Sequence, residues 1–244
     1  MLSLMEKHQL KQYCDENPQL SLLVQHLEDS HRMNLSRISH EIRNPVTIIN
    51  SFLQLTQKTY PEVSDFNTWK PILENMEYLK QLLYEFSEYN NSCRLHKEIF
   101  SLHSFLEHLI SDCQTAIPSI TFFYQKTSAI PMSAFDKTKL QSAILNIIRN
   151  AHEAMETQSH KKIFITLSFE EDFFFIKIAN NGTPIPPEHL PHLFEPFTTY
   201  KKEGSGLGLA IVHNVVLAHS GSITVLSSLE ETSFTLKLPL QYNE

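Results

Sequence analysis

Glycine is scarce in this sequence of 244 residues. An average composition would give about 17 glycines, but the chain has five, and all of them lie between Gly182 and Gly221. The first 181 residues contain none. Any glycine-rich turn or ligand-binding loop is therefore confined to one short stretch in the C-terminal part of the chain.

Cysteine and long apolar runs are also lacking. The three cysteines, Cys14, Cys93 and Cys113, are odd in number and far apart. This spacing excludes a disulfide framework and a cysteine metal site, and it is typical of a reducing compartment. No apolar stretch reaches the roughly 18 residues that span a bilayer, and the N-terminus lacks the apolar core of a signal peptide. We therefore expect a cytoplasmic (cytosolic) protein without a membrane span.

Positive charge is in deficit as well. The chain has 27 acidic and 20 basic side chains, a net charge of -7 and no run of like charge, which argues against a nucleic-acid partner. Apolar residues make up 41% and charged residues 19%, a composition typical of a folded protein whose core needs no cross-links. A locally built site for a small anionic ligand is compatible with these values.

Two apolar stripes predict helices in the first hundred residues, because both follow the three- and four-residue alternation of one helix face. The first stripe consists of Leu35, Ile38, Ile42, Ile49 and Phe52. The second consists of Trp69, Ile72, Met76, Leu79, Leu83 and Phe86. Residues 60–67 between them carry turn and capping residues, which predicts a helical hairpin. Because two helices cannot cover both stripes, we expect a homodimer with a four-helix bundle.

Short strands and helices alternate from about residue 98. Strands are predicted for residues 98–101, 120–125, 162–169, 172–179, 222–227 and 233–238, and helices for residues 102–113, 136–155 and 207–219. This order predicts an α+β domain with a mostly antiparallel sheet. We thus expect a short helical extension over residues 1–30, a helical domain over residues 31–97 and an α+β domain over residues 98–244.

Three of the glycines form the sequence Gly204-Ser-Gly206-Leu-Gly208, directly before a predicted helix. Such a loop lets the backbone approach a phosphate group, whose charge is stabilised by the N–H groups and dipole of the helix N-terminus. The same pattern also occurs in turns that only cap a helix. Further segments are needed to decide between these interpretations.

A second segment places two amides on one helix face. Asn146 and Asn150 lie four residues apart among Ile, Leu and Ala. Amides on an apolar face are costly unless they are hydrogen-bonded, which indicates either a ligand or metal partner or bonds to neighbouring backbone. A third segment, residues 178–185, ends a predicted strand in a turn. It leads to residues 193–203, a linker whose composition is typical of a mobile lid.

The fourth segment reads Ser-His-Glu-Ile-Arg-Asn-Pro and contains His40. His40 lies two residues from both Ile38 and Ile42, about 200° around the helix from each, so we expect its side chain to be exposed and to point away from the apolar stripe. Pro45 cannot donate to the carbonyl oxygen of Glu41, and its ring clashes there. The helix is therefore expected to bend or loosen just after the histidine.

Together these segments resemble, over residues 33–240, the sensor histidine kinases of two-component signalling. The match has five parts: residues 39–45 resemble the phospho-acceptor box, 146–151 the asparagine box, 180–185 the adenine box, 194–197 the lid aromatic pair and 204–208 the second glycine box. The motifs are similar to those of sporulation-type and nitrogen-regulation-type kinases. The resemblance implies a dimeric helical hairpin that carries the histidine, and a Bergerat-type α/β sandwich that binds ATP.

The resemblance also implies the residues that bind nucleotide. Asn150, together with Asn146, would hold Mg and position the phosphates. The other implied nucleotide contacts are Asn180, Gly182, Phe194, Phe197, Thr198, Thr199, Lys201, Gly204, Ser205, Gly206, Leu207 and Gly208.

Catalytic roles are implied for three residues of the hairpin. His40 would accept the γ-phosphoryl group of ATP, with Glu41 as general base. The spacing from Glu41 to Asn44 matches the family's Glu-x-x-Asn pattern, in which the amide orients a water against the phosphoaspartate of a response regulator. The alternative is that Asn44 only satisfies backbone groups freed by Pro45.

Two residues depart from the family's adenine box. Asn180 stands where Asp is usual, and Pro184 where a second glycine is usual. A charge-assisted hydrogen bond contributes about 1.5–3 kcal/mol and a neutral one about 1 kcal/mol, so the missing carboxylate should weaken nucleotide binding about tenfold. Pro184 stiffens the turn and removes one donor. The intact glycine loop and both asparagines argue against complete loss of binding.

We therefore expect a histidine kinase that uses ATP and Mg, is phosphorylated on His40 and exchanges the phosphoryl group with the receiver domain of a response regulator. Two alternatives stay open. One is a family member with a degenerate ATP site that acts as a phosphotransferase or response-regulator phosphatase, and the other is a non-catalytic dimer that docks partners. An ATPase of the gyrase or mismatch-repair type is disfavoured, because those proteins lack the helical His-Glu-x-x-Asn-Pro hairpin.

Overall fold

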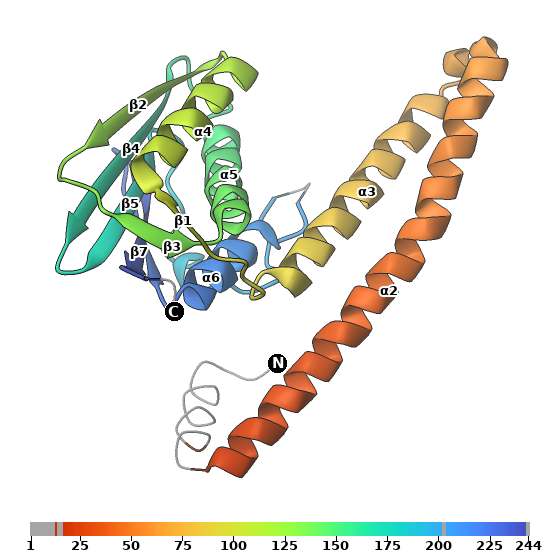
Figure 1. Ribbon diagram of the computed structural model, residues 1–244. Helices are drawn as coiled ribbons and strands as arrows, with labels where there is room; N and C mark the ends of the chain where they lie inside the picture. The colour runs from red at the N-terminus through yellow and green to blue at the C-terminus, as the bar shows by residue number, and fades with distance from the viewer. Residues whose placement is uncertain (1–12, 14–16, 202–203, 243–244) are drawn as a thin grey trace. The chain divides into compact units, whose positions relative to one another are not determined.

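The computed structural model describes Tyr13, residues 17–201 and residues 204–242 (Figure 1). The chain falls into two compact units, Met1–Asn91 and Ser92–Glu244. Of the helical extension expected over residues 1–30, residues 1–12 and 14–16 lie outside the described residues, as do Lys202 and Glu203 of the expected lid.

The first unit is a helical hairpin. Helix α2 spans Pro18–Thr59, the short 3-10 helix η1 spans Pro61–Asp65, and helix α3 spans Trp69–Asn91. The side chain of Asn17 caps the N-terminus of α2 by accepting two backbone N–H bonds. Helices α2 and α3 pack against each other, so the chain forms the hairpin that the two stripes predict.

Helix α2 is not interrupted at Pro45, where we expected it to loosen. The Thr47 hydroxyl donates to the carbonyl oxygen of Arg43 at 2.8 Å. Because proline removes one backbone donor from a helix of 42 residues, the intact turns on either side are sufficient to keep the helix continuous.

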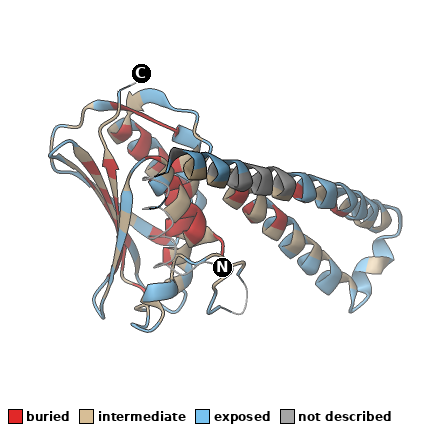
Figure 2. Ribbon diagram, turned by 90° about the horizontal axis from the view of Figure 1, so that it is seen from below, coloured by how far each residue is buried: buried red, intermediate tan, exposed pale blue. Residues whose placement is uncertain are grey.

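The apolar stripe on α2 is largely uncovered in a single chain. Among the residues of the helix whose burial the structure describes, Ser39 and Val46 are buried; they lie seven residues apart and have 1% and 6% of their surface exposed. The stripe residues Ile38, Ile49 and Phe52 are 44%, 49% and 63% exposed, and Figure 2 shows much of this helix as exposed surface. Helix α2 therefore presents an apolar face that α3 does not cover.

The second unit is built on a five-stranded sheet with the order β2-β4-β5-β7-β6. The strands are β2 (Ile120–Lys126), β4 (Lys161–Glu170), β5 (Phe173–Asn180), β6 (Ser222–Ser227) and β7 (Thr232–Pro239). Strands β2 and β4 are parallel and the other pairs are antiparallel. The expected α+β architecture and mostly antiparallel sheet are confirmed.

Three helices cover one face of this sheet (Figure 1). They are α4 (Leu102–Ala116), α5 (Lys137–Ala154) and α6 (Gly208–Ala218). Buried side chains alternate along the strands, as at Ile163, Ile165 and Leu167 of β4, and form the core between sheet and helices.

A small two-stranded sheet completes the unit. Strand β1 (Glu98–Ser101), which was expected, pairs antiparallel with β3 (Met132–Phe135). Strand β3 was not predicted from the sequence. Of the cysteines, Cys93 and Cys113 are free and Cys14 lies outside the described residues. Among the residues that the structure describes, no helix is both long and apolar enough to cross a membrane.

A buried histidine ties α6 to the start of α5. The Nδ1–H of His219 donates to the carbonyl oxygen of Val215 at 2.8 Å, and its Nε2 accepts the backbone N–H of Asp136 at 3.0 Å. Asp136 is the N-cap of α5 and also accepts the backbone N–H of His96. Both imidazole nitrogens are thus used by the neutral ring, and burial lowers the pKa of His219 below its ordinary value of 6.5.

This arrangement predicts acid sensitivity of the second unit. Because the folded pKa of His219 is depressed, the unfolded chain binds the extra proton first as the pH falls. The stabilisation that the neutral His219 ring gives to the folded unit is fully present above about pH 6.5. It is lost as the pH falls through the pKa that His219 has in the folded chain. Urea unfolding between pH 8 and pH 5 should show a smaller pH dependence of the unfolding free energy in His219→Gln than in the wild type. The same change at His160, whose side chain is exposed, should leave the unfolding free energy at pH 8 as in the wild type.

Candidate functional site

The hairpin presents His40, Glu41 and Asn44 on its surface. All three side chains are exposed, and none makes a hydrogen bond or ion pair with another described residue. His40 and Asn44 lie one helical turn apart on the same face of α2. The neighbouring Ser39 is buried and donates to the carbonyl oxygen of Leu35 at 2.9 Å. The exposure expected for His40 is confirmed.

Helix α5 carries the two amides of the second unit. Asn146 is buried, with 9% of its surface exposed, and its Oδ1 accepts from Nη2 of Arg149 at 2.8 Å. Gly208, the first residue of α6, lies against Asn146, since a Cβ at Gly208 would stand 3.4 Å from Asn146 Oδ1. The asparagine segment and the glycine loop are therefore adjacent, although 58 to 62 residues separate Asn146 and Asn150 from Gly208.

The turn after β5 packs against the C-terminal end of the same helix. The backbone N–H of Thr183 donates to the carbonyl oxygen of Ala154 at 2.9 Å. A Cβ at Gly182 would stand 2.7 Å from the backbone of Ala154, so only glycine permits this approach. The N–H of Ile185 donates to Ser227 Oγ at 2.8 Å. The turn with Pro184 is thus fixed at both of its ends beside α5.

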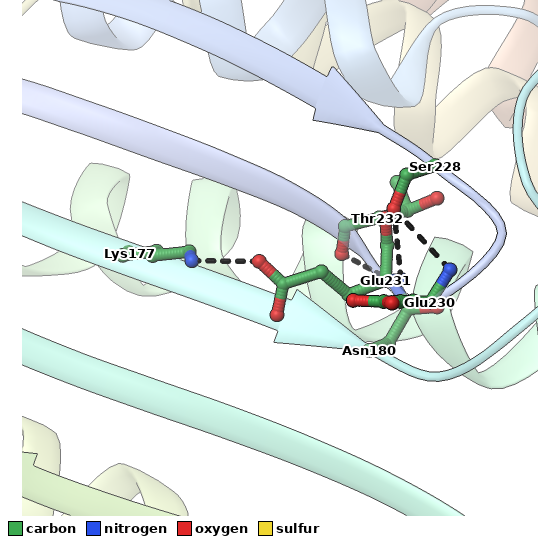
Figure 3. A network of polar contacts seen from close by, with 6 residues as sticks. All are labelled: Lys177, Asn180, Ser228, Glu230, Glu231 and Thr232. Atoms are coloured by element: carbon green, nitrogen blue, oxygen red, sulfur yellow. Dashed lines mark hydrogen bonds and ion pairs between the residues drawn. The ribbon is translucent and has the colours of Figure 1, made fainter.

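Asn180, the last residue of β5, uses both ends of its amide within the protein. Its Oδ1 accepts the N–H of Gly182 at 2.9 Å. Its Nδ2 donates to the carbonyl oxygen of Thr232 at 3.2 Å, and both of these residues are drawn in Figure 3. The side chain is almost fully buried. One Nδ2 hydrogen and one lone pair of Oδ1 remain for a ligand. An aspartate here could not donate to the carbonyl oxygen of Thr232, which explains why asparagine suits this position.

The strand pair beside Asn180 is held by its own polar contacts. Lys177 Nζ pairs with Glu231 Oε1 at 2.7 Å, and Ser228 Oγ accepts the N–H groups of Glu230 and Glu231 (Figure 3). These contacts hold the turn between β6 and β7, so the carbonyl group of Thr232, the first residue of β7, is fixed beside Asn180.

The glycine loop and the segment before it form one packed structure. Gly206 has φ +69°, and a Cβ there would stand 2.6 Å from backbone atoms of Phe197 and Thr198. The N–H of Phe197 donates to the carbonyl oxygen of Gly206 at 3.0 Å. Phe197 itself has φ +64° and is 56% exposed. The sequence predicts a glycine loop here but does not reveal that the lid backbone closes onto Gly206.

The other residues expected to form the lid make contacts within the lid and with α6. Phe194 stacks on His213 of α6 with ring centroids 5.4 Å apart. Thr199 Oγ1 accepts the N–H of Lys201 at 3.3 Å, and a Cβ at Gly204 would stand 3.2 Å from the same oxygen. Ser205 Oγ accepts the N–H of Leu207 at 3.1 Å, and α6 begins without a side-chain cap. Its first N–H groups are therefore suited to an anionic group such as phosphate.

Lys201 of the lid contacts α5. Its Nζ donates to Asn150 Oδ1 at 3.0 Å and forms an ion pair with Glu153 Oε2. Asn150 is half-buried, and Glu153 lies three residues further along, on the same face of the helix. We had not predicted a role for Glu153 from the sequence, although its spacing from Asn150 is the signal that could have found it.

In the second unit, the turn after β5, the lid and the start of α6 thus all contact α5, the helix that carries the two asparagines. Amide and carboxylate oxygens on α5 are of the kind that Mg²⁺ prefers, and Mg²⁺ is commonly held by one or two such groups plus phosphate oxygens. The uncapped N–H groups of α6 provide a phosphate site. The donor set therefore fits a magnesium-bound nucleotide.

Residues 135–242 match the family model described as histidine kinase-, DNA gyrase B- and HSP90-like ATPase. Sporulation kinase D of Bacillus subtilis is 31% identical over 206 residues, which are 83% of this chain and 40% of that protein. Sensory histidine kinase/phosphatase NtrB of Rhizobium meliloti is 25% identical over 84% of this chain and 57% of that protein. The chain spans about half the length of these two curated relatives.

Solved structures share the fold. Full-length ShkA in complex with AMPPNP matches with a TM-score of 0.72 at 21% identity, over 86% of this chain and 46% of that one. Histidine kinase ThkA in complex with the response regulator protein TrrA matches with a TM-score of 0.57 at 22% identity, over 95% of this chain and 66% of that one. The family model thus identifies an ATPase domain of this type over residues 135–242, and over more than four-fifths of its length the chain is similar to sensor histidine kinases of two-component systems.

Proposed function

We propose that this chain is a protein-histidine kinase that phosphorylates His40 from ATP and transfers the phosphoryl group to an aspartate of a response regulator. The observation that carries the proposal is the convergence of Asn146, the glycine loop and the turn after β5 on one helix, because a glycine loop that opens a helix beside polar side chains is suited to a phosphate-bearing ligand. The exposed His40 supplies the acceptor.

In the proposed chemistry the hairpin supplies the phosphoryl acceptor and the general base. A ring nitrogen of His40 forms a bond to the γ-phosphorus, and the bond from that phosphorus to the bridging oxygen of ADP breaks. Glu41 accepts the proton that the imidazole loses. In the second transfer the N–P bond breaks and a carboxylate oxygen of the regulator bonds to phosphorus. The low barrier of both transfers comes from positioning and from stabilised phosphate charge.

In the proposed nucleotide site, Asn150 and Asn146 hold the magnesium side of the triphosphate and the N-terminus of α6 holds its anionic oxygens. A magnesium ion held by these residues would neutralise charge on the transferring phosphoryl group. Asn180 and the turn with Gly182 meet the base, while Phe194, Phe197, Thr198, Thr199 and Lys201 close over the phosphates. The ShkA complex with AMPPNP, a related fold, supports a nucleotide in this unit.

A second activity is favoured by the state of Asn44. The alternative role, bonding to backbone groups freed by Pro45, receives no support, since the Asn44 amide makes no such bond among the described residues. An exposed amide one turn from His40 is free to orient a water against a phosphoaspartate. We therefore propose that the chain also dephosphorylates its regulator, and the name of the NtrB relatives as kinase/phosphatase supports this.

Phosphotransfer to a receiver domain tests the proposed function. After labelling with Mg-ATP and removal of the nucleotide, the label should leave the chain when a receiver domain of the organism's own regulators is added. The matched control is the same receiver domain with its acceptor aspartate changed to asparagine. If no receiver of the complete set removes label from the chain, phosphotransfer is not its function.

We expect Asn180→Asp to strengthen ADP binding about tenfold, because a charge-assisted bond to the adenine amino group replaces a neutral one. The same change removes the donor to the carbonyl oxygen of Thr232, so it should cost about 1 kcal/mol of stability. Calorimetry with ADP and urea unfolding measure the two effects. An Asn181→Asp variant places the same charge on the half-buried neighbour and likewise removes a donor, to the carbonyl oxygen of His160, so it controls for both changes. Equal affinities of wild type and Asn180→Asp would contradict the role given to Asn180.

The uncovered face of α2 predicts a homodimer. Sedimentation of the full chain at micromolar concentration should give a dimer, and Ile49→Glu should weaken it about a hundredfold or more, because burying a charge at an apolar contact costs several kcal/mol. Gln54→Glu places the same charge about 140° away on α2 and should leave the dimer intact. A wild-type monomer at this concentration would refute the prediction.

A further inference from the structure

The contact between the lid and α5 involves two oxygens of the kind that bind Mg²⁺ in proteins. Lys201 Nζ lies between Asn150 Oδ1, at 3.0 Å, and the Glu153 carboxylate. Both partners lie on one face of α5, whereas Lys201 comes from the lid about 50 residues later. The lid ammonium therefore occupies a cation position made of one amide oxygen and one carboxylate oxygen.

We propose that Glu153 and Lys201 make this site selective for metal-bound over metal-free nucleotide, an inference that rests on the proposed function. Lys201 leaves Asn150 and Glu153 when a divalent cation on the nucleotide takes their oxygens, and its ammonium then turns to the phosphates. Both cations cannot use the same oxygens at once, because Mg²⁺ needs its ligands at about 2.0–2.1 Å.

Charge explains why the pair discriminates. Metal-free ADP brings only negative charge to α5, so it is repelled by Glu153 and must draw Lys201 away from that carboxylate. Metal-bound ADP brings a cation that attracts Glu153 and replaces the ammonium there. Glu153 thus weakens the binding of metal-free ADP and strengthens the binding of metal-bound ADP. Lys201 strengthens the binding of metal-free ADP more than that of metal-bound ADP.

An ion pair between Lys201 and Glu153 that only held the lid on α5 would affect nucleotide binding differently. Lys201 and Glu153 are 46% and 42% exposed, and ion pairs of this exposure change an equilibrium by about fivefold at most. Loss of an ion pair with only this role would change the affinities for metal-free and metal-bound ADP by the same factor. The ratio of the two affinities therefore separates the two roles.

The experiment is calorimetry of the full chain with ADP, once with Mg²⁺ and once with EDTA. The ratio of the dissociation constant in EDTA to that in Mg²⁺ should fall about tenfold in Glu153→Gln and rise about threefold or more in Lys201→Met. Glu156→Gln removes an exposed carboxylate just beyond the same helix and should leave the ratio as in the wild type. Equal changes of both affinities in Glu153→Gln, or a ratio that moves the same way in both variants, would overturn the inference.

A second measurement needs no nucleotide. Hydrogen exchange of the backbone amides of residues 197–201 should be about threefold faster in Glu153→Gln and in Lys201→Met than in the wild type and Glu156→Gln. Unchanged exchange in both variants would remove the contact on which the inference rests. If the wild type binds ADP in neither buffer while exchange responds as expected, the proposed function fails and the lid contact stands. If ADP binds and the ratio does not move, the inference alone fails.

Discussion

A His40→Gln variant is expected to take up no phosphoryl group, either from Mg-ATP or from a phosphorylated receiver domain. Glutamine keeps the size and polarity of the side chain but has no ring nitrogen able to bond to phosphorus. Because His40 is exposed and makes no bond within the described residues, the change should leave stability and ADP affinity as in the wild type. Phosphate-affinity electrophoresis and calorimetry measure the two properties.

The matched control for this variant is His26→Gln, the same change at another exposed position of α2. It should be phosphorylated as the wild type is. The role of His40 as acceptor is refuted if His40→Gln still carries phosphate on histidine, since the chain has thirteen histidines and another would then be the acceptor.

An Asn44→Ala variant should lose dephosphorylation of a cognate regulator, by a hundredfold or more, while His40 still exchanges phosphate with it. An acyl phosphate is already activated, so the step needs little beyond a positioned water. Removal of the amide removes that positioning, on the order of 3 kcal/mol of transition-state stabilisation. Release of inorganic phosphate from the phosphorylated receiver measures the first rate, and label transfer to the chain measures the second.

Gln54→Ala truncates another exposed amide of α2 and should change neither rate. Dimerisation must be intact in each variant, which sedimentation shows. Unchanged phosphate release in Asn44→Ala would leave Asn44 with no role in the reaction, and an equal loss of both rates would show that the variant disturbs docking of the regulator rather than the water.

Much of the fold follows from local patterns. The apolar stripes predict the α2 and α3 hairpin, and the alternation of residues 162–169 and 172–179 predicts β4 and β5. Strand β3 was not predicted because Met132–Phe135 contains no β-branched residue. Distant partners fix it: Ala134 N–H donates to the carbonyl oxygen of Gln241, and its register is set by β1. No local signal encodes such pairing.

The hairpin shows a second limit of periodicity. A helical stripe says which residues avoid water but not which partner covers each of them. Ser39 and Val46 are buried, although serine does not belong to the apolar stripe, while Ile38 and Phe52 are exposed in the single chain. The division between the seam with α3 and an outer face depends on how two helices are rotated against each other, which a single sequence does not contain.

The site was predictable as motifs and not as contacts. The spacing of Asn146 and Asn150 placed both on one face of α5, and the glycine cluster predicted the start of α6. The closure of Phe197 onto Gly206 requires two positive φ values, one of them at a phenylalanine, which residue types do not indicate. The pairing of Lys201 with Glu153 joins segments 48 residues apart, and only the folded chain reveals it.

Chemical stability of the bound phosphate tests the proposed kinase activity most directly. The full chain is incubated with labelled Mg-ATP, and the labelled protein is treated with acid or with base. Phosphate on the histidine nitrogen gives a phosphoramidate, so we predict label that is lost in acid, kept in base and located on the peptide that contains His40. Label that survives acid, or no label under conditions in which ADP binds, would contradict phosphorylation of His40 from ATP.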